Sequence, residues 1–341
     1  MTGLEVVEIP IEEFDSAQFQ SWLGETSPEL FREYLLTSSE ARSNLLSCRF
    51  KKLFANVNSE IHVCKRGNEY LAIIGFERLD WDSRHFGVEC GRISPYCISR
   101  NMSRVEQSEI HKLMLDLGVE WARRHNVRVL QRRLLSRRLR EINVLEELGF
   151  HMVDNVVTLA ASIKDVLSAT RKRKSDLIFR SPEKDELEPL ISMTRGAFPY
   201  SRFLNDKVLT EKLGDDLYLK WIARLFAEVT ESKTSGAVDL GIIVGMLQDQ
   251  VVGYVTYRVD QASPQTFGSL IATIELIVVD SAFQGMGIGQ NLFREASLVL
   301  SNLGADLLES STWMNQRLAM SSNQKAGLCV RENLFTYHLC L

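Results

Sequence analysis

Apolar residues in the second half of the chain recur at the spacings of strands and of amphipathic helices. Strands are expected at residues 177–180, 241–247, 251–259, 271–279 and 306–312. Helices are expected from Pro182, over residues 217–228, and from Gln290 to Gly304. Because a helix joins the last two strands, these strands should run parallel. The pattern therefore predicts an α/β (α+β) fold with a mixed sheet flanked by helices.

The first half repeats this order in a weaker form. Strands are expected at residues 69–79, 87–93, 127–135 and 156–161, and helices after Ser103 and over residues 139–148. Ser103 and Glu106 form a capping box, and the helix behind them should bury Ile110, Leu113, Leu117 and Trp121. A polar, basic stretch follows. We expect an N-terminal domain at residues 1–163, a linker at 164–176 and a C-terminal domain at 177–341.

The composition is that of an ordinary globular protein. The chain has 341 residues, 45% of them hydrophobic and 25% charged, with a formal net charge of −4. This charge gives no general attraction to nucleic acid or to an anionic membrane. We see no signal peptide and no run of membrane-spanning length, so a cytoplasmic protein is expected. The six cysteines lack a C-x-x-C pair, which predicts reduced thiols and neither disulfides nor a metal site.

The run Gln284-Gly285-Met286-Gly287-Ile288-Gly289 lies between an expected strand and an expected helix. Glycines allow positive φ and a close approach of the backbone to an anion, and the first turn of a helix offers free N–H groups. The run lacks the G-x-G-x-x-G of a dinucleotide-binding fold and the Gly-Lys-Ser/Thr of a P-loop. It predicts a pyrophosphate cradle, with a plain strand-to-helix turn as the alternative.

This loop resembles the acyl-CoA pyrophosphate loop of the GNAT acyltransferase superfamily, whose pattern is [QR]-x-x-G-x-[GA]. The resemblance implies a GNAT fold that uses acetyl-CoA or another acyl-CoA as co-substrate, without a metal. The implied cofactor-binding residues are Ile277, Val278, Val279, Gln284, Gly285, Met286, Gly287, Ile288, Gly289 and Gln316. In the first half, residues 97–102 occupy the place of this loop and contain no glycine. We expect a degenerate GNAT-like N-terminal domain without a cofactor loop.

Three further segments resemble one branch of this superfamily, the TDP-fucosamine (TDP-4-amino-4,6-dideoxygalactose) acetyltransferases. Residues 81–88 match W-[DE]-x-x-x-F-G, residues 201–203 match S-R-F, and residues 218–222 match Y-x-x-W-I. Residues 1–65 have no counterpart. The resemblance implies acetyl transfer to the primary amine of a nucleotide-linked amino deoxysugar, with an acceptor site at Arg202, Tyr218 and Trp221. A surface ion pair for the arginine and core packing for the aromatic residues are the alternatives.

Acyl transfer to an amine needs a group that removes the amine proton and donors that polarise the thioester carbonyl. Glu275 is the candidate base, and an exposed strand charge is the alternative reading of this residue. Backbone N–H groups beside Ile277 and Val279 are the candidate donors. Strand alternation places these three residues on one face.

The leaving thiolate also needs a proton. Where the family keeps a tyrosine, a gapless alignment places Asn323, and it places Gln316 at a family asparagine. An amide binds the sulfur without handing over a proton. Ser322 acting through water, Tyr337, and unaided departure of the thiolate are the remaining candidates.

Eight arginines lie between Arg123 and Arg140. They indicate a solvated charged face, or else a site for the acceptor's diphosphate or for nucleic acid. The leading function hypothesis is an acyl-CoA-dependent N-acyltransferase for a small-molecule amine, without nucleic-acid or membrane partners and with homodimer formation left open. The rivals are a non-catalytic acyl-CoA-binding protein and a GNAT enzyme that acts on a protein or amino-acid-like amine.

Overall fold

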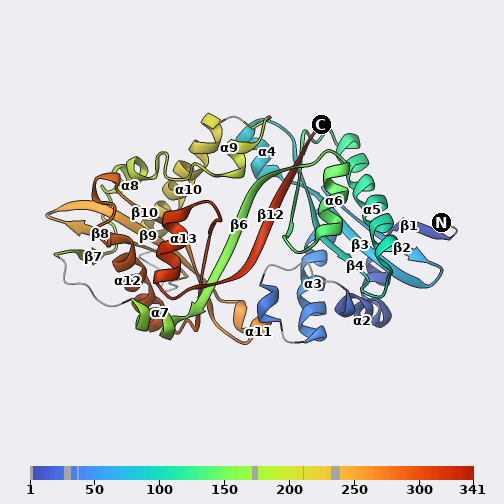
Figure 1. Cartoon of the computed structure of the whole chain (residues 1–341), viewed down its shortest axis with the longest axis horizontal. Coiled ribbons are helices and arrows are strands. Elements are labelled where there is room, and N and C mark those ends of the chain that lie inside the picture. Colours follow the sequence, from blue (N-terminus) through green and yellow to red (C-terminus); the bar gives the residue numbers. More distant parts are fainter. Residues whose placement is uncertain (1–2, 27–31, 37, 171–175, 210, 232–238) are drawn as a thin grey trace. The chain divides into compact units, whose positions relative to one another are not determined.

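The computed structural model describes residues 3–26, 32–36, 38–170, 176–209, 211–231 and 239–341 (Figure 1). The chain forms two compact units. The first consists of Met1–Asn155, Asp206–Thr210 and Leu334–Leu341, and the second of Val156–Asn205 and Glu211–Asn333. Each unit is therefore built from separate stretches of sequence. We expected two continuous domains, at residues 1–163 and 177–341. The observed units differ from these domains because each unit is discontinuous in sequence.

The first unit holds a mixed sheet in the order β1-β2-β3-β4-β5-β12. Its strands are β1 (Leu4–Glu8), β2 (Ser59–Arg66), β3 (Glu69–Arg78), β4 (Cys90–Ile98), β5 (Val129–Leu135) and residues 334–340 of β12 (Cys329–Cys340). Only the β4–β5 pair is parallel among these described pairs. Its helices are α1 (Ile11–Phe14), α2 (Ala17–Glu25), α3 (Ser39–Phe54), α4 (Asp80–Phe86), α5 (Arg104–Arg124) and α6 (Leu139–Glu147), with a 3₁₀ turn at Glu33–Leu35.

Two apolar clusters hold this unit together. Phe19, Leu46 and Phe50 of α2 and α3 pack against Val63 and Ile73 of the sheet. In the second cluster, Ile74, Phe76 and Tyr96 of the sheet pack against Trp121 of α5 and Leu145 of α6. Because successive strand residues point to opposite faces, the two helix pairs cover the two faces of the sheet.

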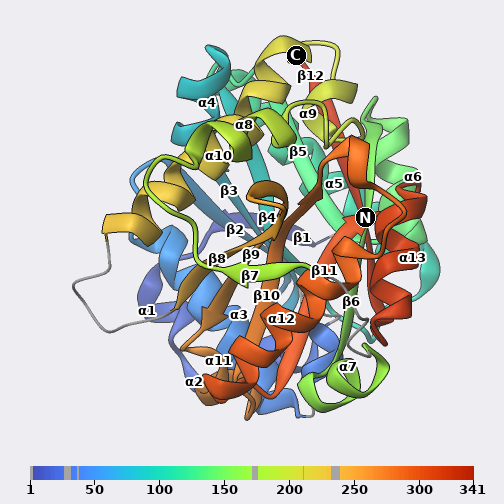
Figure 2. The same cartoon turned by 90° about the vertical axis from the view of Figure 1, so that its left-hand side faces the viewer.

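The second unit repeats the order as β7-β8-β9-β10-β11-β6. Its strands are β7 (Ile178–Arg180), β8 (Leu240–Leu247), β9 (Gln250–Asp260), β10 (Ile271–Val279), β11 (Leu307–Trp313) and residues 156–162 of β6 (His151–Ser162). Its helices are α7 (Ile163–Ala169), α8 (Leu187–Thr194), α9 (Arg202–Asn205), α10 (Glu211–Glu231), α11 (Ser263–Phe267), α12 (Ile288–Asn302) and α13 (Arg317–Lys325), with a 3₁₀ turn, η3, at Ser281–Phe283. Figure 2 shows this unit, in which α12 packs on β8, β9 and β10.

Each unit includes one strand that the order of the sequence would place in the other unit. In the first, β12 from the end of the chain pairs with β5, and in the second, β6 from the first half of the sequence pairs with β11. The predicted mixed sheet with flanking helices is confirmed, and it occurs twice. A strand pattern alone does not say which sheet the strand joins, and this is why the exchange was not predicted.

Several local expectations differ from the structure. The helix expected from Pro182 begins only at Leu187. Residues 163–169 of the region around the expected linker form α7, with Ile163 and Val166 buried, whereas residues 171–175 lie outside the described part. Residues 80–86 form a helix that ends at Gly87 (φ 68°), so the strand expected from residue 87 begins at Cys90. Leu113 is exposed rather than buried.

Other expectations hold. The capping box of Ser103 and Glu106 is present at the start of α5. The strands expected at residues 241–247 and 251–259 are present as β8 and β9, and the hairpin between them turns at Gln248 and Asp249, which both have positive φ. All six cysteines are free thiols. None of the helices in the described ranges is long and apolar enough to cross a bilayer.

Candidate functional site

The parallel strands β10 and β11 of the second unit pair only at their beginnings. The pairing runs from Ile271–Leu307 to Ile274–Ser310, although β10 continues to Val279 and β11 to Trp313. A bulge between Ile274 and Leu276 shifts the register of β10 against β9 at the same point. Beyond it, the described residues show no pairing between β10 and β11. The backbone of β10 can therefore bind an extended ligand along this edge.

The loop after β10 has the geometry of an anion cradle. Gly285 and Gly287 have φ of 82° and 80°, a conformation that side-chain-bearing residues rarely adopt. The side-chain amide of Gln284 donates to the carbonyl oxygen of Val279 at 3.2 Å and folds the loop back onto the strand. Helix α12 begins at Ile288 without a side-chain cap, so the N–H groups of its first turn have no acceptor in the helix. These donors and the helix dipole favour an anion.

Helix α13 brings a hydroxyl to this loop. A Cβ atom placed on Gly289 would lie 3.7 Å from Cγ2 of Val279 and 3.8 Å from Oγ of Ser322. The structure therefore places Val279, Gly289 and Ser322 together, as expected for one site. Gln316, the N-cap of α13, is half-buried and makes no side-chain cap.

The neighbouring Asn323 is 3% exposed, and its side-chain Oδ1 is buried with no hydrogen-bond partner among the described residues. A buried acceptor left unpaired costs free energy. This oxygen is thus available to a donor group of a bound molecule.

Glu275 is not an exposed charge on a strand, which was the alternative interpretation of this residue. Its side chain is 16% exposed, and one carboxylate oxygen accepts a hydrogen bond from Nε of Arg258 at 3.0 Å. The other oxygen, Oε2, is buried and has no hydrogen-bond partner in the described part of the chain. Along β10, Glu275, Ile277 and Val279 are half-buried, whereas the residues between them are buried. The bulge leaves Glu275 unpaired and breaks the alternation at this residue. Ile277 and Val279 pack on the apolar cluster that includes α12, whereas Glu275 pairs with Arg258, which also reaches Glu228 of α10. The prediction that the three residues share one face is therefore wrong, because it assumed a strand without a bulge.

Four aromatic side chains form a cluster in the same unit. Tyr218 stacks on Phe198 with ring centroids 4.4 Å apart and on Trp221 at 6.1 Å, and its ring lies 6.4 Å from that of Trp313. Tyr218 is buried, whereas Trp313, the last residue of β11, is half-buried. Phe198 and Trp313 were missed from the sequence because no local pattern links residues so far apart. The cluster lies at the end of β11 that is no longer paired with β10.

The guanidinium group of Arg202 lies over the ring of Phe203, 4.2 Å from its centroid. Its Nε atom is buried and has no hydrogen-bond partner among the described residues, and they offer it no ion pair. The surface ion pair weighed for this residue is therefore not observed within the described ranges. A guanidinium in such a setting can bind an acceptor oxygen.

Tyr337, one of the candidates for the acid, belongs to the first unit. Its hydroxyl donates to Glu146 at 2.9 Å, and burial together with that hydrogen bond raises its pKa to about 12. Its proton is thus held by a carboxylate of the first unit.

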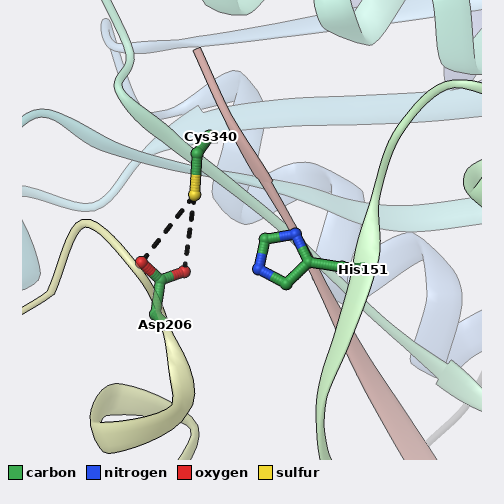
Figure 3. Close-up of side chains that lie close together, drawn as sticks. All are labelled: His151, Asp206 and Cys340. Atoms are coloured by element: carbon green, nitrogen blue, oxygen red, sulfur yellow. Dashed lines mark hydrogen bonds between the residues drawn. The ribbon is translucent and has the colours of Figure 1, made fainter.

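Figure 3 shows a polar cluster of the first unit formed by His151, Asp206 and Cys340. The Cys340 sulfur lies 3.8 Å from both carboxylate oxygens of Asp206, and His338 binds the same carboxylate through Nδ1. Burial raises the pKa of Asp206, but the hydrogen bonds from His338 and from two backbone amides outweigh it, so the pKa is lowered. Burial raises the pKa of Cys340 to about 11, which keeps it a thiol. These contacts tie residues 206–209 to β12 and account for the cluster structurally.

Comparison with known proteins extends these observations. Residues 209–320 match the model of the acetyltransferase (GNAT) family. A GCN5-related N-acetyltransferase from Sphaerobacter thermophilus is similar in structure, with a TM-score of 0.64 and 13% identity over 99% of this chain and 95% of the other. A tandem GNAT protein from the clavulanic acid biosynthesis pathway has a TM-score of 0.58 and 12% identity over 99% and 98%.

A third similar structure is the glucosamine N-acetyltransferase region of a fungal multi-domain GH3 β-N-acetylglucosaminidase. It has a TM-score of 0.57 and 14% identity, covering 98% of this chain and 38% of that one. No curated protein sequence matches the chain. These likenesses confirm the GNAT fold that the glycine loop predicts.

Proposed function

We propose that the chain is an acyl-CoA-dependent N-acyltransferase whose acceptor is the primary amine of a nucleotide-linked amino deoxysugar. The proposal is supported by the match of residues 209–320 to the GNAT acetyltransferase family and by the GNAT fold. The acyl donor is acetyl-CoA or another short acyl-CoA. The observation that carries the proposal is the glycine loop at the start of α12, beside the edge where β10 and β11 part.

The glycine loop supports a binding position for the acyl-CoA. The diphosphate of CoA binds the N–H groups at Gly285–Gly289, where three of the five residues are glycines and Gly285 and Gly287 have positive φ. The pantetheine arm extends along β10 beyond Ile274 like an added strand. Backbone N–H groups beside Ile277 and Val279 polarise the thioester carbonyl as negative charge develops on its oxygen.

Glu275 supports the chemistry at the acceptor. The amine nitrogen attacks the thioester carbon, its proton passes to the carboxylate directly or through water, and the carbon–sulfur bond breaks to release CoA. The unpartnered Oε2 is the oxygen available for that proton, because Oε1 is held by Arg258.

Three observations support an amino-sugar acceptor. The segments at residues 81–88, 201–203 and 218–222 resemble enzymes that act on such sugars. The aromatic cluster of Phe198, Tyr218, Trp221 and Trp313 offers apolar faces on which a sugar ring can lie. One similar structure is named as a glucosamine N-acetyltransferase region. We propose Arg202, Tyr218 and Trp221 as acceptor-binding residues and the cytoplasm as the place of action.

A second candidate function is non-catalytic acyl-CoA binding. It is favoured by Asn323, because an amide stands at the position where the family has a tyrosine that can serve as the general acid. Release of free thiol from acetyl-CoA in the presence of a panel of amines separates the two. We expect release that depends on the amine and is fastest with a nucleotide-linked amino sugar. CoA binding without thiol release would favour non-catalytic acyl-CoA binding. Fastest release with a peptide or amino-acid amine would show that the acceptor belongs to that class of amines.

The role of Asn323 gives a specific prediction. Asn323→Tyr should keep acetyl-CoA binding and raise the rate or shift its pH dependence, because a phenol adds a proton donor. Asn323→Ala should cost little. Steady-state rates over a pH series check both, with acetyl-CoA affinity as the control. A proton donor typically contributes roughly a hundredfold or more, so a loss that large in Asn323→Ala would show that the amide is essential. If neither change had an effect, Ser322→Ala would be the next variant to measure.

A further inference from the structure

The first unit contains a cavity of about 600 Å³, which the proposed acyl transfer does not use. It lies where β4 ends, between α5 and the start of α6, and its wall includes Ile98, Arg100, His111 and Arg140. In the order of elements this is the counterpart of the glycine loop in the second unit. Its lining contains no glycine, so any ligand must be held mainly by side chains.

The wall of the cavity carries a surplus of positive charge. Four arginines line it, at positions 100, 137, 138 and 140, together with the carboxylates of Glu33 and Glu141. Both carboxylates are already engaged. Glu33 pairs with Arg137, and Glu141 pairs with Arg138 and with the fully buried Arg132.

Arg100 and Arg140 have no carboxylate partner among the described residues. Arg100 donates through Nε to the carbonyl oxygen of Thr26 at 3.1 Å, and Arg140 donates through one terminal nitrogen to Oε1 of Gln107 at 2.9 Å. Both acceptors are neutral. Each guanidinium has five N–H donors, so most of them remain available to a bound anion.

Two further groups, the start of α6 and the neutral ring of His111, can donate hydrogen bonds to an anion. Helix α6 starts at the cavity with no side-chain cap, and the free N–H groups of its first turn form the positive end of the helix dipole. His111 shares a hydrogen bond between its Nδ1 and the hydroxyl of Tyr96 at 2.7 Å, and no described residue binds its Nε2. Burial lowers the pKa of His111 to about 4, so the ring stays neutral at pH 7.

We propose that this cavity, the Arg100 pocket, binds a small diphosphate ester. Guanidinium groups match phosphate oxygens in bidentate geometry, and two uncompensated arginines beside a helix start suit a group that carries several negative charges. The cavity is also larger than inorganic phosphate requires, which leaves room for an organic part. The eight-arginine segment is therefore more than a solvated face: three of its members line this pocket.

The test uses the whole chain with Gly287→Asp, a change designed to disable the glycine loop of the second unit. Calorimetric titration with uridine diphosphate should show binding in this background. Adding Arg100→Ala and Arg140→Ala should weaken it by about tenfold or more per guanidinium. Arg123→Ala is the matched control, because it removes an exposed arginine whose side chain makes no hydrogen bond or ion pair with the described residues, and it should leave the affinity unchanged.

Equal affinities in the double variant and in the Arg123→Ala control would overturn the proposal, and so would citrate binding as tightly as uridine diphosphate. Acetyl-CoA binding in the Gly287→Asp background that depends on Arg100 and Arg140 would identify CoA as the source of the diphosphate. If the double variant does not fold, Arg140→Gln, which retains a hydrogen-bonding amide, provides the same comparison.

Discussion

Replacing Gly287 by aspartate is expected to abolish acetyl-CoA binding. Gly287 has φ of 80° and is the N-cap of α12, so the new carboxylate would stand at the first free N–H groups of the helix. It would occupy the anion site and repel the CoA diphosphate. Placing like charges together costs several kcal/mol, which corresponds to a loss of roughly a hundredfold or more in affinity. Calorimetry with acetyl-CoA measures this directly.

Two controls separate charge from backbone strain. A residue with a side chain at positive φ costs about 1–2 kcal/mol wherever it stands. Gly304, beyond the other end of the same helix, has φ of 82° and open space where a Cβ atom would lie, so Gly304→Asp introduces the same strain away from the loop. Gly287→Asn keeps the size of aspartate without its charge. Gly304→Asp should bind acetyl-CoA normally, and Gly287→Asn should lose less affinity than Gly287→Asp.

Glu275→Gln is expected to lower the turnover rate by roughly a hundredfold to ten-thousandfold while leaving acetyl-CoA affinity unchanged. The amide keeps the shape of the carboxylate but cannot take the proton of the attacking amine. Turnover by thiol release and affinity by calorimetry are the two measurements. If the rate falls only because the amine arrives protonated, raising the pH should recover part of it.

The same ion-pair network offers the matched control. Arg258 lies 3.0 Å from Glu275 and 4.0 Å from Glu228 on α10, a second carboxylate that is more exposed. Glu228→Gln removes a charge near the same arginine without touching β10, and its turnover should stay close to that of the wild type. Similar losses in both variants would assign Glu275 a structural role in the network instead of a chemical one.

The glycine loop could be predicted from the sequence because its causes are local. Positive φ at residues 285 and 287 requires glycine, and a strand on one side with an uncapped helix on the other follows from short-range patterns. The two strands that flank Gln248 and Asp249 were predictable from equally short-range patterns. The proximity of Ser322 to Gly289 followed only from the resemblance to a family, since no spacing rule connects α13 to α12.

The features that the sequence did not reveal depend on contacts between distant segments. The exchange of β6 and β12 is decided by which sheet edge accepts each strand, and both strands have patterns that suit either edge. The aromatic cluster joins Phe198, Tyr218 and Trp313 from three separate elements. The Arg100 pocket likewise combines the end of β4 with the start of α6. The density of arginines was visible in the sequence, but their convergence on a cavity was not.

We propose that one acyl-CoA binds per chain, at Gln284–Gly289 of the second unit. The most direct test is a calorimetric titration of the wild-type chain and of Gly287→Asp with acetyl-CoA. We expect one site per chain in the wild type and none in the variant. Two equivalent sites in the wild type, or unchanged affinity in a folded Gly287→Asp protein, would contradict it.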